Sequence, residues 1–134
     1  MASDISKYLG NKIARWLGGQ AMPTAPINLY MALFVGDPKG AGTEVTTTIR
    51  STGRPAITWT VPASNDVDNV LVNSAAVDWG VAENDADGTS HVAIFDASSG
   101  GKRIASKALL APVDIKSGTP VSFGAGDVNF VIGT

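Results

Sequence analysis

The sequence of 134 residues lacks cysteine and has a single histidine, His91. Without thiols there is no disulfide framework and no thiolate zinc site, and their absence says little about the compartment. His91 can act as a base only if a nucleophile and an orienting group converge on it. Its position beside Thr89 and Ser90 is more typical of a surface or strand-edge residue. We therefore expect no catalytic residue, no cofactor and no metal ligand.

Long hydrophobic runs are also absent. The stretch MASDISKYLGNKIARWLGG is interrupted by charges throughout, unlike the apolar run of about 7 to 15 residues in a secretory signal. No segment approaches the roughly 20 apolar residues of a membrane span. A chain of this length buries roughly two thirds of the surface of its unfolded state, enough for a domain without metal or disulfide. We expect one soluble domain, residues 1–134, that is not exported through a cleaved signal.

An excess of basic charge is missing as well. The net charge is −2, which argues against direct binding of nucleic acid. Charge is nevertheless uneven along the chain. Residues 1–60 carry six Lys and Arg against three Asp and Glu, whereas residues 61–134 carry four against nine. Such asymmetry can orient neighbouring copies in an ordered assembly; the alternative is that the charges intermingle once the chain folds.

The N-terminal region has the pattern of one helix, over residues 3–18. Ser3 or Asp4 can cap it, Gly18 and Gly19 can close it, and Pro23 prevents its continuation. Apolar residues recur at steps of three and four and form one stripe: Ile5, Leu9, Ile13, Trp16 and Leu17. We expect this stripe to pack on the domain core or on a neighbouring subunit, rather than to lie on a membrane.

From residue 27 onward the sequence changes to short extended runs. They lie at residues 27–36, 44–49, 55–61, 69–73, 91–97, 102–110, 120–124 and 128–133, each bounded by Gly, Pro, Asn, Asp or Ser. Short strands at spacings of about 8 to 15 residues, with no second long helical pattern, are typical of antiparallel sandwiches and barrels. We predict a mainly β fold: an antiparallel β-sandwich over residues 27–134, jelly-roll-like or immunoglobulin-like, with one N-terminal α-helix.

Most aromatic residues fall at strand positions, where a buried core is the expected role. We predict that they form the core of the sandwich rather than a platform for sugars or bases. They are Phe34, Trp59, Trp79, Phe95, Phe123 and Phe130.

Two stretches have some features of ligand-binding loops. ENDADG, residues 83–88, places carboxylates at Glu83, Asp85 and Asp87 as a calcium loop does, but the twelfth position, which needs a bidentate carboxylate, is Ile94. A turn before a strand is therefore favoured over a structural or incidental cation site. SSGGKR, residues 98–103, lacks the glycine and the hydroxyl residue of a phosphate loop. It is predicted to be a hairpin turn.

An ordered series of phrases adds a functional indication. After the helix come LYMALFVGDP, GTEV, RPAITW, VDWG, HVAIFDASSGG and FGAGDVNFVIG. In this order they resemble a family of small structural proteins of tailed bacteriophages and prophages, often labelled tail-fibre or hypothetical virion proteins. TTTIRSTGRPAITW departs from the pattern by lacking a glycine and a tyrosine ahead of the arginine, and VAENDADGTSHVAIF by a longer acidic insertion. The resemblance implies a virion component without enzymatic activity.

Within that class we first expect a capsid decoration or cement protein, because a compact domain without fibrous repeats suits a knob that clamps capsid subunits. It would be made in the cytoplasm of the bacterial host, reside in the virion, form homo-oligomers and bind the major capsid protein, stabilising the assembled shell by linkage. The alternative is a tail-fibre or baseplate component for host attachment, with tail proteins as its partners.

Three regions are the candidate contact elements. The first is the helix, through Ile5, Leu9, Ile13 and Trp16. The second is residues 36–54, a polar segment that we expect to act as an arm adding a strand to a partner sheet, with Lys39, Glu44, Arg50 and Arg54. The third is the acidic loop, Glu83, Asp85 and Asp87, which would face basic groups on a neighbour.

Overall fold

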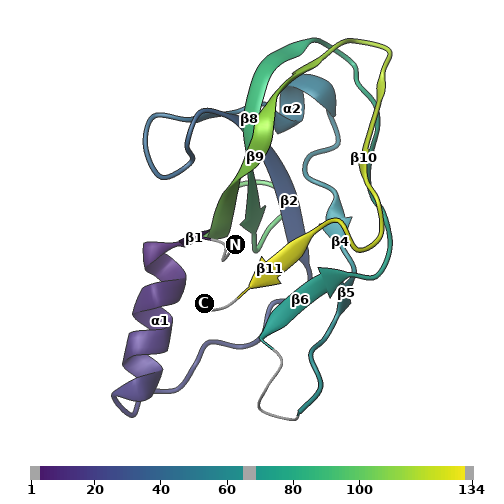
Figure 1. The fold of residues 1–134 in the computed structure, drawn as a ribbon. Coiled ribbons are helices and arrows are strands. Elements are labelled where there is room, and N and C mark those ends of the chain that lie inside the picture. Colours follow the sequence, from purple (N-terminus) through teal and green to yellow (C-terminus); the bar gives the residue numbers. More distant parts are fainter. Residues whose placement is uncertain (1–3, 65–68, 132–134) are drawn as a thin grey trace.

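A computed structural model describes residues 4–64 and 69–131 of the chain (Figure 1). Strands hold 43% of these residues and helices 12%, and every strand pairing is antiparallel. The predicted fold class, a mainly β fold with an N-terminal helix, is thereby confirmed. No helix in the described part of the chain is long and apolar enough to cross a membrane.

The large sheet has six strands in the order β1-β9-β8-β2-β3, and β4 pairs with β2 beside this path. Their bounds are β1 (Asp4–Ile5), β2 (Leu29–Val35), β3 (Thr43–Glu44), β4 (Ala56–Ile57), β8 (Ala86–Phe95) and β9 (Arg103–Ile115). β2 is central, because β8 covers one of its edges while β3 and β4 cover the two ends of the other.

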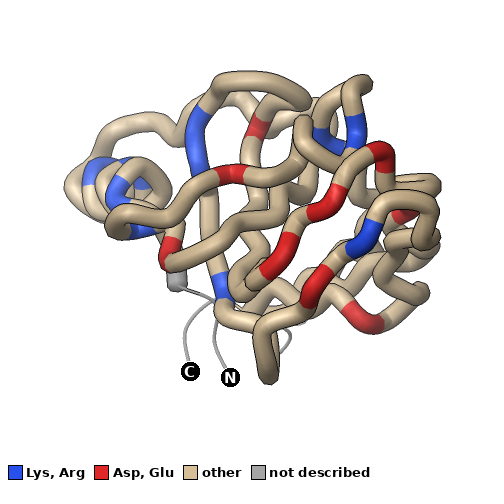
Figure 2. Tube along the Cα trace, turned by 90° about the horizontal axis from the view of Figure 1, so that it is seen from above, with Lys and Arg blue, Asp and Glu red and all other residues tan. Residues whose placement is uncertain are grey.

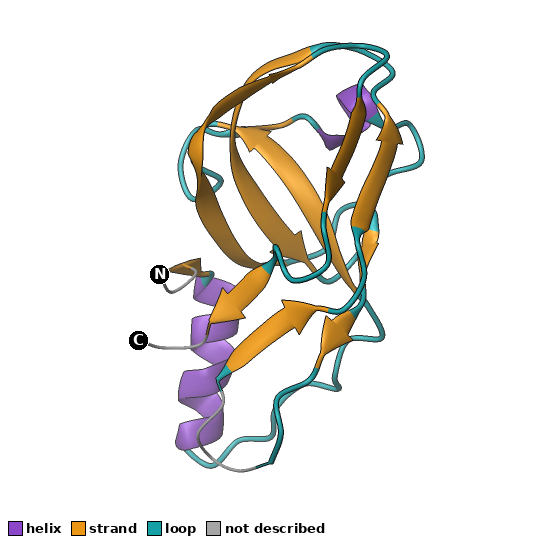
Figure 3. Cartoon of the chain, turned by 45° about the vertical axis from the view of Figure 1, so that its right-hand side comes forward, coloured by secondary structure: helices purple, strands orange, loops and turns teal. Residues whose placement is uncertain are grey.

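Two smaller sheets lie opposite (Figure 3). One pairs β7 (Val77–Val81) with β10 (Pro120–Phe123), and the other has the order β11-β6-β5, with β11 (Asn129–Val131), β6 (Val70–Asn73) and β5 (Trp59–Thr60). β7 was not among the predicted strands. Its alternation was nevertheless readable, since Val77 and Trp79 are buried while Asp78 and Gly80 are exposed, as period two requires.

The main core lies between the large sheet and the smaller ones. β2 contributes Met31 and Leu33, β7 contributes Trp79, and β11 contributes Phe130. The predicted core positions of Phe34, Trp79 and Phe130 are confirmed, and Trp59, Phe95 and Phe123 are partly buried and pack against the buried clusters. β2 is buried on both faces, because Ala32 and Phe34 pack with Ala93 and Phe95 on the outer side of the sheet.

The N-terminal helix, α1 (Lys7–Leu17), begins later than predicted. Ser6 caps it, since its side-chain oxygen accepts a hydrogen bond from the Leu9 N–H at 3.1 Å. The predicted cap Asp4 lies instead in β1, which pairs with Ala105 and Ser106 of β9, and residue 3 lies outside the described residues. Sheet pairing keeps residues 4 and 5 extended, so the next suitable capping residue starts the helix.

The predicted strand over residues 44–49 is wrong beyond its first residue. β3 ends at Glu44, and a single helical turn, α2 (Thr46–Ile49), follows. Thr46 and Ile49 are both buried, and Thr46 accepts a hydrogen bond from the Leu33 N–H at 3.2 Å. β-Branched residues favour strands in isolation, but a helical turn buries two side chains three positions apart beside β2, so tertiary packing outweighs propensity.

The hairpin of β8 and β9 is longer than the predicted strands at 91–97 and 102–110. β8 already begins at Ala86, which pairs with Ile115 at the far end of β9. Asp87 and Gly88 therefore lie within a strand rather than in a turn before it. Their low strand propensity is outweighed by cross-strand pairing, and register shifts mark the irregular part of the hairpin.

Candidate interaction surfaces

The helix α1 stands at the edge of the molecule and leaves most of its apolar stripe uncovered. None of its residues is buried. Leu9 packs against the core and Ile13 is half-buried, whereas the side chains of Trp16 and Leu17 are 56% and 75% exposed. α1 contacts β9 near its first turn and points away from the sheets (Figure 1). The stripe is therefore only partly used within the chain.

The apolar exposure continues past the helix into the connection to β2. Every residue from 18 to 28 is exposed, and Ile27 is 97% exposed. We call residues 5–28 the N-terminal arm. The helix carries the basic residues Lys7, Lys12 and Arg15 and no acidic residue. In Figure 2 the basic positions of the helix lie at one side of the molecule, and most acidic positions lie on the other parts of the chain. The arm thus combines exposed apolar area with positive charge.

Two predicted contact residues, Glu44 and Arg54, bind each other inside the domain. The Arg54 guanidinium donates from Nε and Nη2 to the two carboxylate oxygens of Glu44, both at 2.8 Å. Its Nη1 donates to the carbonyls of Ala97 and Gly100 at 3.0 and 2.7 Å. A bidentate arginine–carboxylate pair of this kind is rigid and directional. It ties β3 to the turn between β8 and β9.

The pair is largely shielded from water. Arg54 is 8% exposed, and its guanidinium lies 3.7 Å from the centre of the Phe95 ring, which stacks on Phe34. Burial works to raise the pKa of Glu44, but hydrogen bonds from Arg54 and Thr46 and the charge of Arg54 outweigh it, so the pKa lies below its usual value. Glu44 is therefore held as a carboxylate for internal binding.

Segment 36–54 is consequently part of the domain rather than a detached arm. β3 pairs with β2, and the Arg50 guanidinium donates to the Asp78 carbonyl at 3.0 Å. Lys39 lies in an exposed turn, where its backbone N–H donates to the Asp37 carboxylate at 2.9 Å. The structure thus brings Glu44 and Arg54 together and leaves Lys39 and Arg50 apart at the surface.

The acidic residues at 83–87 are largely engaged with neighbouring segments. Glu83 accepts hydrogen bonds from the Ser51 N–H and hydroxyl, and Asp85 accepts one from the Ser117 N–H. Lys116 lies 2.8 Å from Asp87, a hydrogen bond that raises the pKa of its ammonium group. In the part of the chain that the structure describes, no group of three or more acidic or histidine side chains is arranged to hold a metal ion.

His91 and the glycine-rich stretch occupy structural positions. His91 is half-buried in β8, and its Nδ1 lies 2.8 Å from the hydroxyl of Ser90, which itself accepts a hydrogen bond from the Gly36 N–H. The hairpin predicted at residues 98–103 is confirmed, with Gly100 and Gly101 at φ of 62° and 72°. The Ser90 hydroxyl connects β8 to Gly36 at the end of β2, and the hairpin joins β8 to β9.

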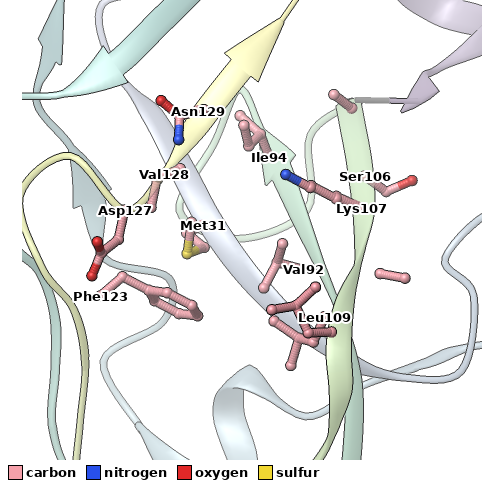
Figure 4. Close-up of a pocket in the computed structure, with 13 residues that line it drawn as sticks. Met31, Val92, Ile94, Ser106, Lys107, Leu109, Phe123, Asp127, Val128 and Asn129 are labelled. Carbon is pink, nitrogen blue, oxygen red and sulfur yellow. The ribbon is translucent and has the colours of Figure 1, made fainter. Parts of the chain in front are cut away.

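A cavity between the large sheet and the β10–β11 side was not foreseen. Its volume is about 670 Å³, within the range of roughly 300 to 1,000 Å³ found for ligand pockets. Figure 4 shows Met31, Val92 and Ile94 on its floor, with side chains of β9 on one side and of residues 123–129 on the other. No sequence signal marks it, because its walls come from strands that are distant in the chain.

The β9 side of the cavity contains a wide bulge. Two steps along β8, from Thr89 to His91, correspond to five steps along β9, from Ala108 to Val113. The additional residues are displaced from the ladder. Leu110 lies in this bulge and is fully exposed, at 109%, and it is also among the residues that line the cavity.

The conspicuous surface features of the described residues are thus an exposed amphipathic arm and an apolar cavity lined in part by the exposed Leu110. Comparison with known families identifies the class of protein. Residues 4–131 match the model of the Podophage GP4 fiber I protein gp80 family, and the chain belongs to that family. It is thus a bacteriophage structural protein, as the resemblance implied. No curated protein matches the chain.

Proposed function

We propose that the chain is a non-enzymatic component of the tail-fibre apparatus, held to other tail proteins through its N-terminal arm. The observation that carries the assignment to the tail is the family match over residues 4–131 to a fibre protein. It favours the tail-fibre alternative over the capsid decoration role that we first expected, for which neither the family nor the structure offers support.

The arm is the attachment element because its apolar area is exposed within the chain. Trp16 and Leu17, on the last turn of α1, are more than half exposed. Burial of such side chains at an interface is favourable by about 1.5 to 3 kcal/mol each, and tryptophan is enriched among the residues that dominate binding. A role without catalysis agrees with the environment of His91, whose Nδ1 meets a hydroxyl rather than a carboxylate.

Fractionation of phage particles tests the location. Complete virions and heads purified without tails would be digested and analysed by mass spectrometry for peptides of this chain. We expect the peptides in virions and in detached tails, and we expect none in heads. Recovery from tail-less heads in the same ratio to the major capsid protein as in virions would contradict the proposal and restore the decoration role.

Attachment through the arm is tested by complementation of a phage that lacks the gene. The double variant Trp16→Ser with Leu17→Ser should fold, since both side chains are exposed, but it should be incorporated into particles much less than the unchanged protein. The matched control is Val61→Ser, which removes an equally exposed apolar side chain, at 75%, outside the arm. Equal incorporation of the arm variant and the control would show that the arm is not the attachment element.

The absence of catalysis has its own test. His91→Gln keeps a polar side chain of similar size in β8 and removes the imidazole. We expect complemented phage to infect as well as with the unchanged protein. Loss of infection by a variant that is still incorporated and folded would point to chemistry at His91.

A further inference from the structure

We propose that the cavity and the β9 bulge form a self-complementary interface with a second copy of this chain, in which Leu110 of each copy enters the cavity of the other. The inference concerns self-association of the isolated protein, so it does not depend on where the protein resides in the virion or on the arm.

Leu110 is the projecting part of this interface. Leu110 lies in the bulge opposite Thr89 and His91, so it does not pair with β8. The residue is fully exposed to solvent. Single exposed leucines are common on protein surfaces. This one is distinctive because it is also among the residues that line an apolar cavity, so that a projection and a recess adjoin each other.

The recess is large enough for the projection. Its floor is formed by Met31, Val92 and Ile94, and Phe123 and Val128 stand on the side opposite β9 (Figure 4). The volume of about 670 Å³ corresponds to roughly twenty waters at their share of liquid volume, about 30 Å³ each. A leucine with its neighbours in the bulge would displace many of them and bury apolar surface on both partners, which is favourable.

The adjacency of projection and recess is the reason for choosing a second copy. In an interface with a two-fold axis, residue i of one subunit contacts residue j of the other, and j contacts i. A surface with both parts side by side satisfies this condition. Rotation by 180° places the projection of each copy over the recess of its partner, and the contact closes at two copies.

Charged residues that line the cavity support the same arrangement. Lys107 lies on the β9 side and Asp127 on the opposite side, before β11 (Figure 4). When the β9 bulge of a second copy enters between these sides, its own Lys107 comes next to Asp127 of the first. The two-fold axis repeats the pair, so two complementary contacts orient the copies.

The first experiment measures the mass of the purified full chain by sedimentation equilibrium over a wide concentration range. We expect a reversible dimer. Leu110→Asp should raise its dissociation constant roughly tenfold or more, because burial of a leucine is favourable by about 1.5 to 3 kcal/mol. Since Leu110 is fully exposed within the chain, the variant should keep its melting temperature. Val61→Asp, at an exposed apolar site away from the cavity, is the control and should leave the dimer unchanged.

The second experiment tests the arrangement through the charges and through cross-linking. Lys107→Glu should weaken the dimer, and adding Asp127→Asn should restore part of the loss by removing the repulsion. Because the chain has no cysteine, an oxidised mixture of Lys107→Cys and Asp127→Cys proteins should form a disulfide between copies. A mixture of Lys39→Cys and Asp127→Cys proteins is the control and should form far less.

Two results would overturn the proposal. One is a monomer at all concentrations up to the solubility limit, which would leave the cavity to a small apolar ligand or to another protein. The other is a dimer that responds equally to Leu110→Asp and Val61→Asp, which would place the dimer contact elsewhere.

Discussion

Arg54 connects three parts of the chain through one side chain. Its guanidinium binds the carboxylate of Glu44, the carbonyls of Ala97 and Gly100, and the face of Phe95. In the sequence it was assigned to a contact surface, because a single arginine in a polar segment carries no sign of its partner. The partner becomes apparent only when β3 pairs with β2 and brings position 44 beside the hairpin turn.

Replacement of Arg54 is expected to be among the costly changes in the chain. Arg54→Met leaves Glu44 partly buried without its counter-charge, and loss of one member of a buried pair costs about 3 to 5 kcal/mol of the free energy of unfolding. Arg54→Lys should cost less, because lysine keeps the positive charge and loses only the bidentate hydrogen bonds. Urea denaturation measures both. The control Lys102→Met, at an exposed site, should stay within about 0.5 kcal/mol of the unchanged protein.

The same pair makes stability depend on pH. The pKa of Glu44 in the folded state lies below its ordinary value of 4.5, so the carboxylate form is favoured by folding. Its contribution is complete above pH 4.5 and is lost as pH falls further, through the lowered pKa of the folded state. Glu44→Gln should be less stable at neutral pH and should show a weaker fall in unfolding free energy in acid. Parallel pH curves for the two proteins would refute this account.

At the scale of elements, the hairpin of β8 and β9 shows how a turn is specified. Asp96 closes it, because its carboxylate accepts a hydrogen bond from the Lys102 N–H at 2.7 Å and its own N–H donates to the Lys102 carbonyl. Gly101 must be glycine for two reasons: its φ is positive, and a Cβ there would lie 2.5 Å from the Asp96 carboxylate and 2.7 Å from Cβ of Ala97.

Adjacent glycines allow these two reasons to be separated. Gly100→Ala meets no atom within 4 Å, so it should cost only the left-handed backbone penalty of about 1 to 2 kcal/mol. Gly101→Ala carries the same penalty and adds steric crowding, for which overpacking costs about 1 to 3 kcal/mol. Thermal unfolding of both variants gives the difference directly. A cost for Gly100→Ala equal to or above that for Gly101→Ala would contradict the steric argument.

The sequence predicted elements whose structure depends on neighbouring residues. It did not predict features that depend on contacts between distant segments. Short extended runs bounded by turn residues located most strands, and the glycines at 100 and 101 predicted the hairpin. The turn at Thr46–Ile49 was missed because its buried side chains depend on β2, and the start of β8 because its pairing depends on Ile115. The bulge at Leu110 was missed for the same reason, since it exists only relative to the register of β8. The cavity was missed too, because its walls come from several strands that are distant in the sequence.

At the scale of the whole molecule, charge is separated only in part. The helix α1 carries basic residues and no acidic ones, whereas elsewhere opposite charges pair, as Arg54 does with Glu44 and Lys116 with Asp87. In Figure 2 the basic positions of α1 lie at one side of the molecule, and most acidic positions lie on the other parts of the chain. The intermingling that we held open from the sequence is therefore incomplete. Local potential at a surface depends on such clusters more than on net charge.

Retention on a charged resin tests this separation. Despite its net charge of −2, the protein should bind a cation-exchange resin at pH 7 and low salt through α1. The variant with Lys7, Lys12 and Arg15 changed to Gln should flow through. Changing three other basic residues, Lys39, Lys102 and Lys116, to Gln alters the net charge equally and should largely preserve retention. Equal loss of retention in both variants would mean that the resin responds to total charge alone.

The exposed connection at residues 18–28 has a consequence for the history of such proteins. None of these residues is buried, so the β-domain places few demands on their identity or number. An exchange of coding sequence within this stretch would join a new arm to an unchanged domain in one event. Under the attachment role proposed for the arm, a phage lineage can in this way change what the protein binds while inheriting its core intact.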